Sequence, residues 1–241
     1  MEPINNSLLE RATDLFNSLA KRVESSDIDK IRPIRGHISE YLFCMFHEYC
    51  MSENKAIDMA FHGTGGEVAD SVQLYGMFDP TFAGYNVKNG NVWGKGVYVS
   101  PNINFAKGYA RNNGIIIAGL IIKGVTEKEK FVTGHNDLNS DSQVIGDIIV
   151  LRSTSQMLPL FVVPGTCVNT ANINNTVYDQ SYVDELLTVE PANVEMVNTT
   201  KHLKAMFPKV KFGVIYQLLF RKKLDVNATC DDLTNLNYED Y

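Results

Sequence analysis

Several features that would direct this chain to a membrane or an export route are missing from its 241 residues. The first residues, Met1 to Ile4, are followed by polar residues instead of the apolar core of a signal peptide. The longest apolar run, around Ile115–Ile122, is far too short to span a bilayer. We therefore expect an intracellular protein, cytoplasmic or nuclear, that makes no membrane contact.

Cysteine is also scarce. The chain has four cysteines, which are widely spaced and match no zinc-binding pattern: Cys44, Cys50, Cys167 and Cys230. We expect no metal site, and a reducing compartment is the simplest location for these thiols.

Basic residues are outnumbered, and their distribution is uneven. The formal net charge is −6, and this acidic balance argues against nucleic acid as a general partner. Residues 201–223 nevertheless hold seven lysines and arginines and no acid, whereas residues 224–241 hold five acids and no base. The tail is therefore locally bipolar.

The composition allows one full domain and a small second one. Apolar residues make up 44% of the chain, which supports a sizeable core. Apolar residues at helical spacing predict a first helix from Ser7 and a second over 38–49, whereas 60–163 consists of short β runs separated by glycine and asparagine. Residues 164–198 have the composition of a connector, with a short helical turn at 182–187. We therefore expect an α+β fold.

The most informative motifs lie in the first half of the β-rich region. The triplet His62-Gly63-Thr64 is followed by Trp93-Gly94-Lys95-Gly96-Val97-Tyr98-Val99-Ser100, and Tyr109 stands eleven residues beyond Tyr98. Their order and spacing resemble the nicotinamide and ribose half of the NAD site in diphtheria-toxin-like ADP-ribosyltransferases, in the branch of the poly(ADP-ribose) polymerases (PARPs). The resemblance implies that NAD is the substrate.

The chemistry of NAD cleavage explains these residue types. Breaking the nicotinamide–ribose bond passes through an oxocarbenium-like state, as glycosidic cleavage does. The ring faces of Tyr98 and Tyr109 would clamp the flat nicotinamide, since aromatic stacking adds about 0.5–1.5 kcal/mol beyond area burial. His62 would hold a ribose hydroxyl, and Gly63, which has no Cβ, would bring its backbone close to the carboxamide. The resemblance assigns Thr64 to the same cofactor-binding set.

The resemblance extends over roughly half of the chain, from Tyr41 to Val163. A loop over 75–85 resembles the donor loop that covers the cofactor, which adds Tyr85 to the cofactor-binding residues. We therefore expect residues 1–163 to form the catalytic domain, an ADP-ribosyltransferase split β-sandwich with a helical lead-in over 7–55.

The position that decides the length of the product is an isoleucine. In this family the third catalytic residue lies eight residues before a glutamine, and counting back from Gln156 gives Ile148. Polymerising members have a glutamate there, whereas members with isoleucine or leucine transfer a single ADP-ribose. Ile148 has no lone pair and cannot act as a general base. The neighbouring Asp147 is no substitute in a regular strand, because adjacent side chains then point to opposite faces.

These residues predict mono-ADP-ribosylation of a protein acceptor with release of nicotinamide, with His62, Tyr98 and Ile148 at the catalytic centre. Without an enzyme base, an acceptor carboxylate or thiolate, already nucleophilic at neutral pH, is favoured over a hydroxyl. One departure keeps an alternative open: Ala106 stands where the family usually has a serine that donates to the carboxamide, a loss of about 0.5–1.5 kcal/mol. The alternative is a catalytically inactive PARP-like pseudoenzyme that binds NAD, ADP-ribose or ubiquitin.

Two other transferase classes have less support. The basic segment over 201–223 suggests a transferase that acts on nucleic acid, but the acidic balance elsewhere opposes it. The triplet Ser153-Thr154-Ser155 imitates the central motif of toxin-type transferases of the Arg–Ser–Glu group, but no Glu-x-Glu or Gln-x-Glu pair follows at a plausible place.

The last forty residues carry a second resemblance, to the CUE domain, a three-helix ubiquitin-binding module. The similarity rests on Leu203–Pro208, Ile215, Leu218, Leu219, Asp225 and Cys230–Leu233. Pro208 would end the first helix and Asp225 would cap the third. The resemblance implies a small helical domain over 199–241 that contacts ubiquitin or a ubiquitylated protein through Met206, Phe207, Pro208 and Leu233. The second leucine of the usual pair is replaced here by Thr234.

Overall fold

The chain folds into helices and mainly antiparallel sheets, the α+β class expected from its sequence. The computed structural model describes residues 6–34, 46, 56–66, 93, 96–110, 113–124, 126–128, 142–153, 156–187, 194–208, 210, 215, 218–219, 222 and 224–235. Most of the helix expected over 38–49 and the whole donor loop, Tyr85 included, lie outside these residues. Among the described helices, none is both long and apolar enough to cross a membrane.

The described strands form two four-stranded sheets. The first sheet is antiparallel and has the order β1 (Arg32–Pro33), β8 (Met157–Pro164), β4 (Ile115–Ile122) and β2 (Ile57–Thr64). The second sheet has the order β3 (Val97–Val99), β7 (Ile148–Leu151), β6 (Ser142–Ile145) and β5 (Thr126–Lys128), with β5 parallel to β6.

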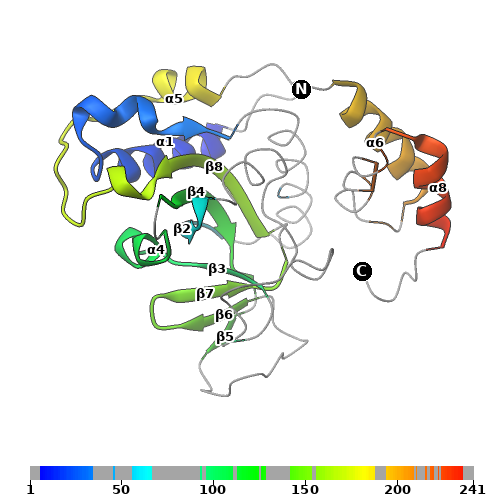
Figure 1. The fold of residues 1–241 in the computed structure, drawn as a ribbon, viewed down its shortest axis with the longest axis horizontal. Coiled ribbons are helices and arrows are strands. Elements are labelled where there is room, and N and C mark those ends of the chain that lie inside the picture. The colour runs from blue at the N-terminus through cyan, green and yellow to red at the C-terminus, as the bar shows by residue number, and fades with distance from the viewer. Residues whose placement is uncertain are drawn as a thin grey trace.

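Helical segments cover both faces of the first sheet (Figure 1). The described helical segments of the chain are α1 (Asn6–Ala20), η1 (Ser25–Lys30), α4 (Ile103–Tyr109), η4 (Gly165–Cys167), α5 (Gln180–Leu187), α6 (Val194–Met206) and α8 (Val226–Thr234), of which α6 and α8 lie apart from this sheet. In Figure 1, α1 and α5 lie above the first sheet, and α4 and the second sheet lie below it. This layering places α4 beside the second sheet, on the same side of β2.

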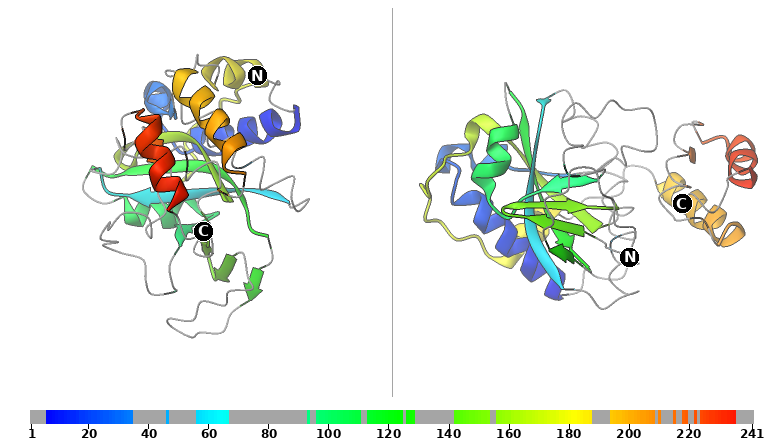
Figure 2. Two further views of the ribbon diagram at one scale, coloured as in Figure 1. Left: turned by 90° about the vertical axis from the view of Figure 1, so that its right-hand side faces the viewer. Right: turned by 90° about the horizontal axis from the view of Figure 1, so that it is seen from below.

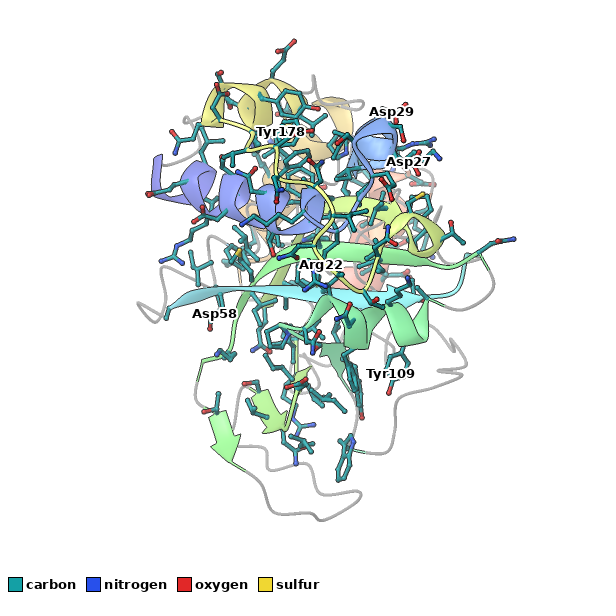
Figure 3. All side chains as sticks on the ribbon, turned by 90° about the vertical axis from the view of Figure 1, so that its left-hand side faces the viewer. Arg22, Asp27, Asp29, Asp58, Tyr109 and Tyr178 are labelled. Atoms are coloured by element: carbon teal, nitrogen blue, oxygen red, sulfur yellow. The ribbon has the colours of Figure 1, made fainter. Side chains whose placement is uncertain are left out.

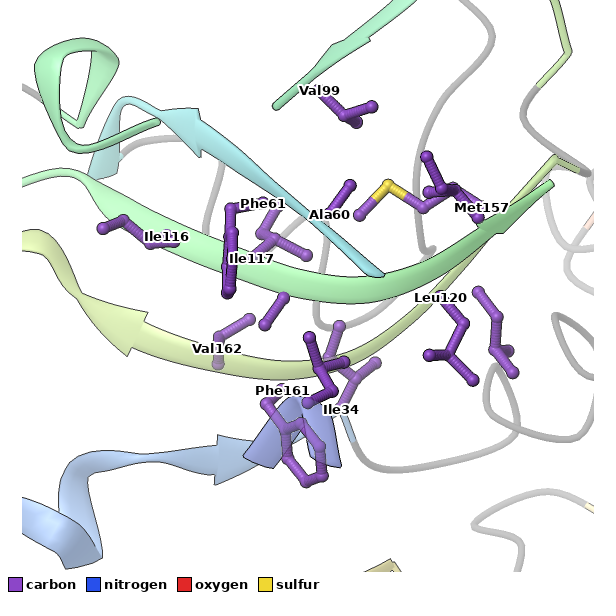
Figure 4. Close-up of a cluster of buried hydrophobic side chains, with 14 of the residues drawn as sticks. Ile34, Ala60, Phe61, Val99, Ile116, Ile117, Leu120, Met157, Phe161 and Val162 are labelled. Carbon is purple, nitrogen blue, oxygen red and sulfur yellow. The ribbon is translucent and has the colours of Figure 1, made fainter. Parts of the chain in front are cut away.

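The first sheet supplies most of the core. Every residue of β4 is buried, as its unbroken apolar run predicts for a central strand. Phe16 of α1 packs edge-on against Phe161 of β8 with ring centroids 5.3 Å apart. On the other face, Val99 of the second sheet belongs to the same cluster as Ala60 and Phe61 of β2 (Figure 4). The two sheets and α1 therefore share one hydrophobic cluster, as expected for a sandwich with N-terminal helices.

The segment expected to be a connector is partly built into this body. Val168 forms a β-bridge with Val23, and the side-chain amide of Asn17 both donates to the Tyr178 carbonyl (2.9 Å) and accepts from the Tyr178 N–H (2.8 Å). Helix α5, the expected turn at 182–187, packs on α1. Residues 164–187 of the expected connector are therefore held against α1 and the residues that follow it, where the Asn169 N–H donates to the Arg22 carbonyl and the Ile173 N–H to the Lys21 carbonyl.

The C-terminal helices α6 and α8 lie side by side, away from the two sheets (Figures 1 and 2). Helix α6 begins at Val194, earlier than the predicted boundary at residue 199, and ends at Met206, as Pro208 predicts. Asp225 caps α8, since its Oδ1 accepts from the Ala228 N–H at 3.0 Å. The buried side chains of this C-terminal part include Leu203 of α6, Leu233 of α8, and Ile215 and Leu219 from the segment between these helices.

Candidate active site

The two sheets meet where β2 passes the end of β3. The Phe61 N–H donates to the Ser100 carbonyl at 2.8 Å, and the Ser100 N–H donates to the Phe61 carbonyl at 2.9 Å. Beyond this isolated bridge the strands separate, because β2 stays paired with β4 and β3 pairs with β7. His62, Gly63 and Thr64 of β2 and Tyr98 of β3, which belong to the two sequence motifs, therefore lie where the strands diverge.

The side chain of His62 connects the two diverging strands. Its Nδ1 lies 2.7 Å from the Tyr98 carbonyl oxygen. A carbonyl can only accept, so Nδ1 carries the proton and donates, which leaves a lone pair on Nε2. Burial lowers the pKa of His62, and the hydrogen bond to Tyr98 opposes this shift without cancelling it. His62 is therefore a neutral imidazole whose Nε2 can accept a hydrogen bond from a hydroxyl.

The backbone N–H and C=O of Gly63 point away from β4, to the side of β2 on which Ser100 lies. The N–H and C=O of Phe61 point to Ser100, and in a regular antiparallel ladder those of Gly63, two residues on, point to the same side. A Cβ on Gly63 would lie 1.8 Å from the carbonyl oxygen of Ala106 in α4. The sequence explained this glycine by the approach of a ligand, but the structure shows that α4 already leaves no room for a side chain. Thr64 follows at the partly exposed end of β2.

Tyr98 occupies the middle of β3 and points away from the sandwich core. Val97 and Val99 on either side are buried in that core, so alternation turns the Tyr98 ring to the outer face of the second sheet. Its hydroxyl accepts a hydrogen bond from the Trp93 N–H at 3.0 Å. Burial raises the pKa of Tyr98, so the phenol stays protonated at neutral pH.

The second aromatic of the expected clamp, Tyr109, is the last residue of α4. Its side chain is 51% exposed, and its ring lies 5.3 Å from that of Phe105. Figure 3 shows the Tyr109 ring extending from α4 away from the first sheet. Tyr109 and Arg152 both act electrostatically on the Tyr98 phenol, with Arg152 lowering its pKa and Tyr109 raising it. The two tyrosines therefore border one region.

Ile148 begins β7 and shares a face with Tyr98. Tyr98 pairs with Val150, and Ile148 lies two residues before Val150, so their side chains point the same way. Asp147 is not in the strand: Gly146, with φ +57°, and Asp147 form the two-residue turn of the β6–β7 hairpin. The assumption that strand alternation governs Asp147 is therefore wrong. Its Oδ2 accepts a hydrogen bond from Asn102 Nδ2 at 3.1 Å.

Sequence reasoning missed three side chains around the site. Gln156, used only as a counting marker, is fully buried: its Oε1 accepts from the Ser153 N–H at 2.8 Å and its Nε2 donates to the Ile122 carbonyl at 2.9 Å. It fixes the turn between β7 and β8. Arg152 donates to Gln143 Oε1 at 3.3 Å. Asn102 caps α4 through Oδ1. An asparagine directly before a short apolar segment is typical of a helix N-cap, so this role could have been predicted from the sequence.

The expected ubiquitin-facing residues divide into exposed and buried ones. Met206 is 60% exposed, Pro208 is exposed and Phe207 is partly buried. Leu233 has no exposed surface, because it packs into the core of the C-terminal helices. The assignment of Leu233 as a contact residue is therefore corrected. Thr234 is the exposed neighbour, so the polar substitution falls on the solvent-facing member of the pair.

The chain is similar to known structures only at low sequence identity and low TM-score. No protein-family model matches the chain, and no curated protein sequence matches it. Among the solved structures that match, the PARP domain of Arabidopsis RADICAL-INDUCED CELL DEATH1 is 15% identical, with a TM-score of 0.45 over 66% of this chain and 97% of that chain. The TASOR pseudo-PARP domain is 11% identical, with a TM-score of 0.42 over 68% of this chain and 95% of that chain. At this level of identity and structural similarity, the likeness assigns no function to this chain.

Proposed function

We propose that this protein is a mono-ADP-ribosyltransferase that moves one ADP-ribose from NAD to a protein acceptor and releases nicotinamide. The observation that carries the proposal is the hydrogen bond from His62 Nδ1 to the Tyr98 carbonyl, made across two diverging strands. It sets a hydroxyl acceptor, His62 Nε2, beside the backbone N–H and C=O of Gly63 and an aromatic face.

These groups match the polar and flat parts of a nicotinamide riboside. A primary carboxamide has one carbonyl and one NH₂ group. Its NH₂ can donate to the Gly63 carbonyl and its carbonyl can accept from the Gly63 N–H, as a neighbouring strand would. The ring then stacks between Tyr98 and Tyr109, and a ribose hydroxyl donates to His62 Nε2. In this arrangement Thr64 continues the cofactor-binding edge of β2.

The proposal specifies a single transfer because Ile148 occupies the place next to Tyr98 where chain growth needs a polar group. An apolar side chain there cannot accept a hydrogen bond, so it cannot orient a ribose hydroxyl of an attached ADP-ribose for attack.

Adenine-labelled NAD tests the function directly. Incubation of the protein with labelled NAD and candidate acceptors, resolved on a denaturing gel, should give a discrete band without a ladder. Tyr98→Ala should abolish the band while the protein stays folded. A smear that a chain-degrading glycohydrolase collapses would exclude mono-transfer, and absence of both NAD cleavage and an NAD-dependent rise in melting temperature would exclude the enzyme.

The second candidate is a catalytically inactive module that binds ADP-ribose or NAD, and Arg152 is the observation that favours it. Arg152 is close enough to the Tyr98 phenol to act on it electrostatically. A guanidinium beside the stacking ring opposes a cationic pyridinium, and Ala106 offers no hydroxyl to offset this. If this candidate holds, ADP-ribose should raise the melting temperature more than NAD does, and Arg152→Gln should narrow the difference.

We also propose that the C-terminal helices bind ubiquitin through the end of α6. Met206, the last residue of α6, is 60% exposed, and Phe207 and Pro208 extend the surface at that end of the helix. Because Leu233 is buried, the contact is smaller than the CUE resemblance implied, and we expect correspondingly weak binding.

A further inference from the structure

The turn between β6 and β7 places a carboxylate next to the apolar third position of the site. Asp147 is exposed, directly precedes Ile148, and belongs to the two-residue hairpin turn after Gly146. A turn residue is not bound by the alternation that a strand imposes, so Asp147 and Ile148 are not forced to opposite faces.

Asn102 holds this carboxylate in one place. Its Nδ2 donates to Asp147 Oδ2 at 3.1 Å, while its Oδ1 accepts from the Asn104 N–H at 3.0 Å and so caps α4. The cap anchors the asparagine to the helix that covers Gly63 and carries Tyr109. Asp147 is therefore fixed to the same helix as two parts of the site, although it comes from the second sheet.

The carboxylate keeps an oxygen available. Among the described residues, only Asn102 forms a hydrogen bond or ion pair with Asp147, and it uses Oδ2 alone. The donor is a neutral amide, so it orients the carboxylate without neutralising its charge. Oδ1 has no hydrogen-bond partner among the described residues, and a carboxylate oxygen can accept a proton from a bound group.

The separation of Asp147 from Tyr98 along the sheet is compatible with a base that contacts the acceptor hydroxyl. Tyr98 pairs with Val150, and β7 begins two residues before Val150 at Ile148, about 7 Å along the strand at roughly 3.3 Å per residue; Asp147 is the turn residue directly before it. A base must lie about 3 Å from the hydroxyl it deprotonates, and the hydroxyl about 3–3.5 Å from the carbon it attacks. A nicotinamide stacked on Tyr98 plus these two contacts spans a similar length.

We propose that Asp147 is the general base that Ile148 is not, and that the acceptor of the transferase therefore carries a hydroxyl group. This rests on the proposed function. The acceptor oxygen bonds to the anomeric carbon of the nicotinamide ribose, and its proton passes to Asp147 Oδ1. The ribose–nitrogen bond breaks with its electron pair going to the pyridinium nitrogen, and neutral nicotinamide leaves. The expected preference for a carboxylate or thiolate acceptor assumed that no base was present.

Asp147→Asn is the matched change, because the asparagine carbonyl still accepts from Asn102 while the base is removed. The full-length variant and wild type are given NAD in water, in dilute methanol and with azide, and ADP-ribose, methyl ADP-ribose and ADP-ribosyl azide are separated by chromatography. Water and methanol must lose a proton during attack, whereas azide carries none. Asp27→Asn, which changes a partly exposed acid on η1 that pairs with Lys30, is the control.

A general base contributes roughly 10²–10⁴-fold, so Asp147→Asn should lower hydrolysis and methanolysis at least about 100-fold. Azide transfer by the same sample should stay within about 3-fold of wild type, which also reports an intact site. Equal losses with azide and water, or no loss with either, would overturn the assignment of Asp147. If wild type yields no product with any nucleophile, the proposed function itself fails and the base assignment fails with it.

Discussion

Replacing His62 by asparagine or by glutamine should separate the two tasks of its ring nitrogens. The amide nitrogen of asparagine sits close to where Nδ1 does, so His62→Asn can still donate to the Tyr98 carbonyl. The glutamine amide sits close to Nε2, so His62→Gln keeps a group for the ribose hydroxyl but loses the bond across the two strands. His62→Ala loses both.

The structure sets the size of each effect. Loss of the 2.7 Å hydrogen bond leaves the Tyr98 carbonyl without this partner in a partly buried place. We expect His62→Gln and His62→Ala to lose about 1–3 kcal/mol of unfolding free energy, and His62→Asn less than about 1 kcal/mol. At about 2–4 °C per kcal/mol for a chain of this size, 2 kcal/mol corresponds to a fall of roughly 4–8 °C in melting temperature.

Activity should follow the opposite order for the two amides. His62→Asn removes the acceptor for a ribose hydroxyl, so kcat/KM for NAD cleavage should fall about tenfold, the kinetic equivalent of about 1.4 kcal/mol. His62→Gln should retain more activity per folded molecule than His62→Asn. Urea denaturation at pH 7.5 measures stability, and release of labelled nicotinamide measures cleavage.

The lowered pKa of His62 adds a pH test with a definite sign. Because the folded state holds the imidazole neutral, the unfolded state binds the proton first as pH falls below its ordinary pKa of 6.5. Wild type should therefore lose stability below pH 6.5, by at most about 1.4 kcal/mol per pH unit from this group, and His62→Asn should lose less. Equal stability of the asparagine and glutamine variants, or parallel pH curves for wild type and His62→Asn, would refute the assignment of the two nitrogens.

Other consequences can be tested on the same protein. Gln156→Leu leaves two backbone groups without their Gln156 partner and should lower the free energy of unfolding by about 2–4 kcal/mol, as measured by urea denaturation. The control Gln180→Leu changes an exposed residue and should stay within about 0.5 kcal/mol of wild type. Similar small values for both variants would show that the buried amide does not stabilise the turn. Titrating the protein into labelled ubiquitin should shift a compact set of amide signals that the Met206→Ala, Phe207→Ala double variant removes. Leu233→Ala should instead lower stability by about 2–5 kcal/mol, and an unchanged melting temperature would contradict its burial.

The local sequence determined the elements with strong periodicity. The spacing of apolar residues predicted α1, the unbroken apolar run predicted the buried strand β4, and Pro208 and Asp225 predicted the end of α6 and the cap of α8. These features depend on neighbours within a few residues, where side-chain period and backbone capping act directly. The order of the His-Gly-Thr and Tyr98 motifs likewise predicted which segments border one site.

Only the tertiary structure decided how those segments meet. The bond from His62 to Tyr98 depends on β2 and β3 entering different sheets after one shared bridge, a long-range pairing that no local pattern encodes. Asp147 changed from a strand residue to a turn residue because the register of β6 and β7 fixes the hairpin. Leu233 became a core residue because other helices of the C-terminal part cover it. In each case the sequence supplied the chemical group, and pairing or packing with distant residues determined what that group can contact.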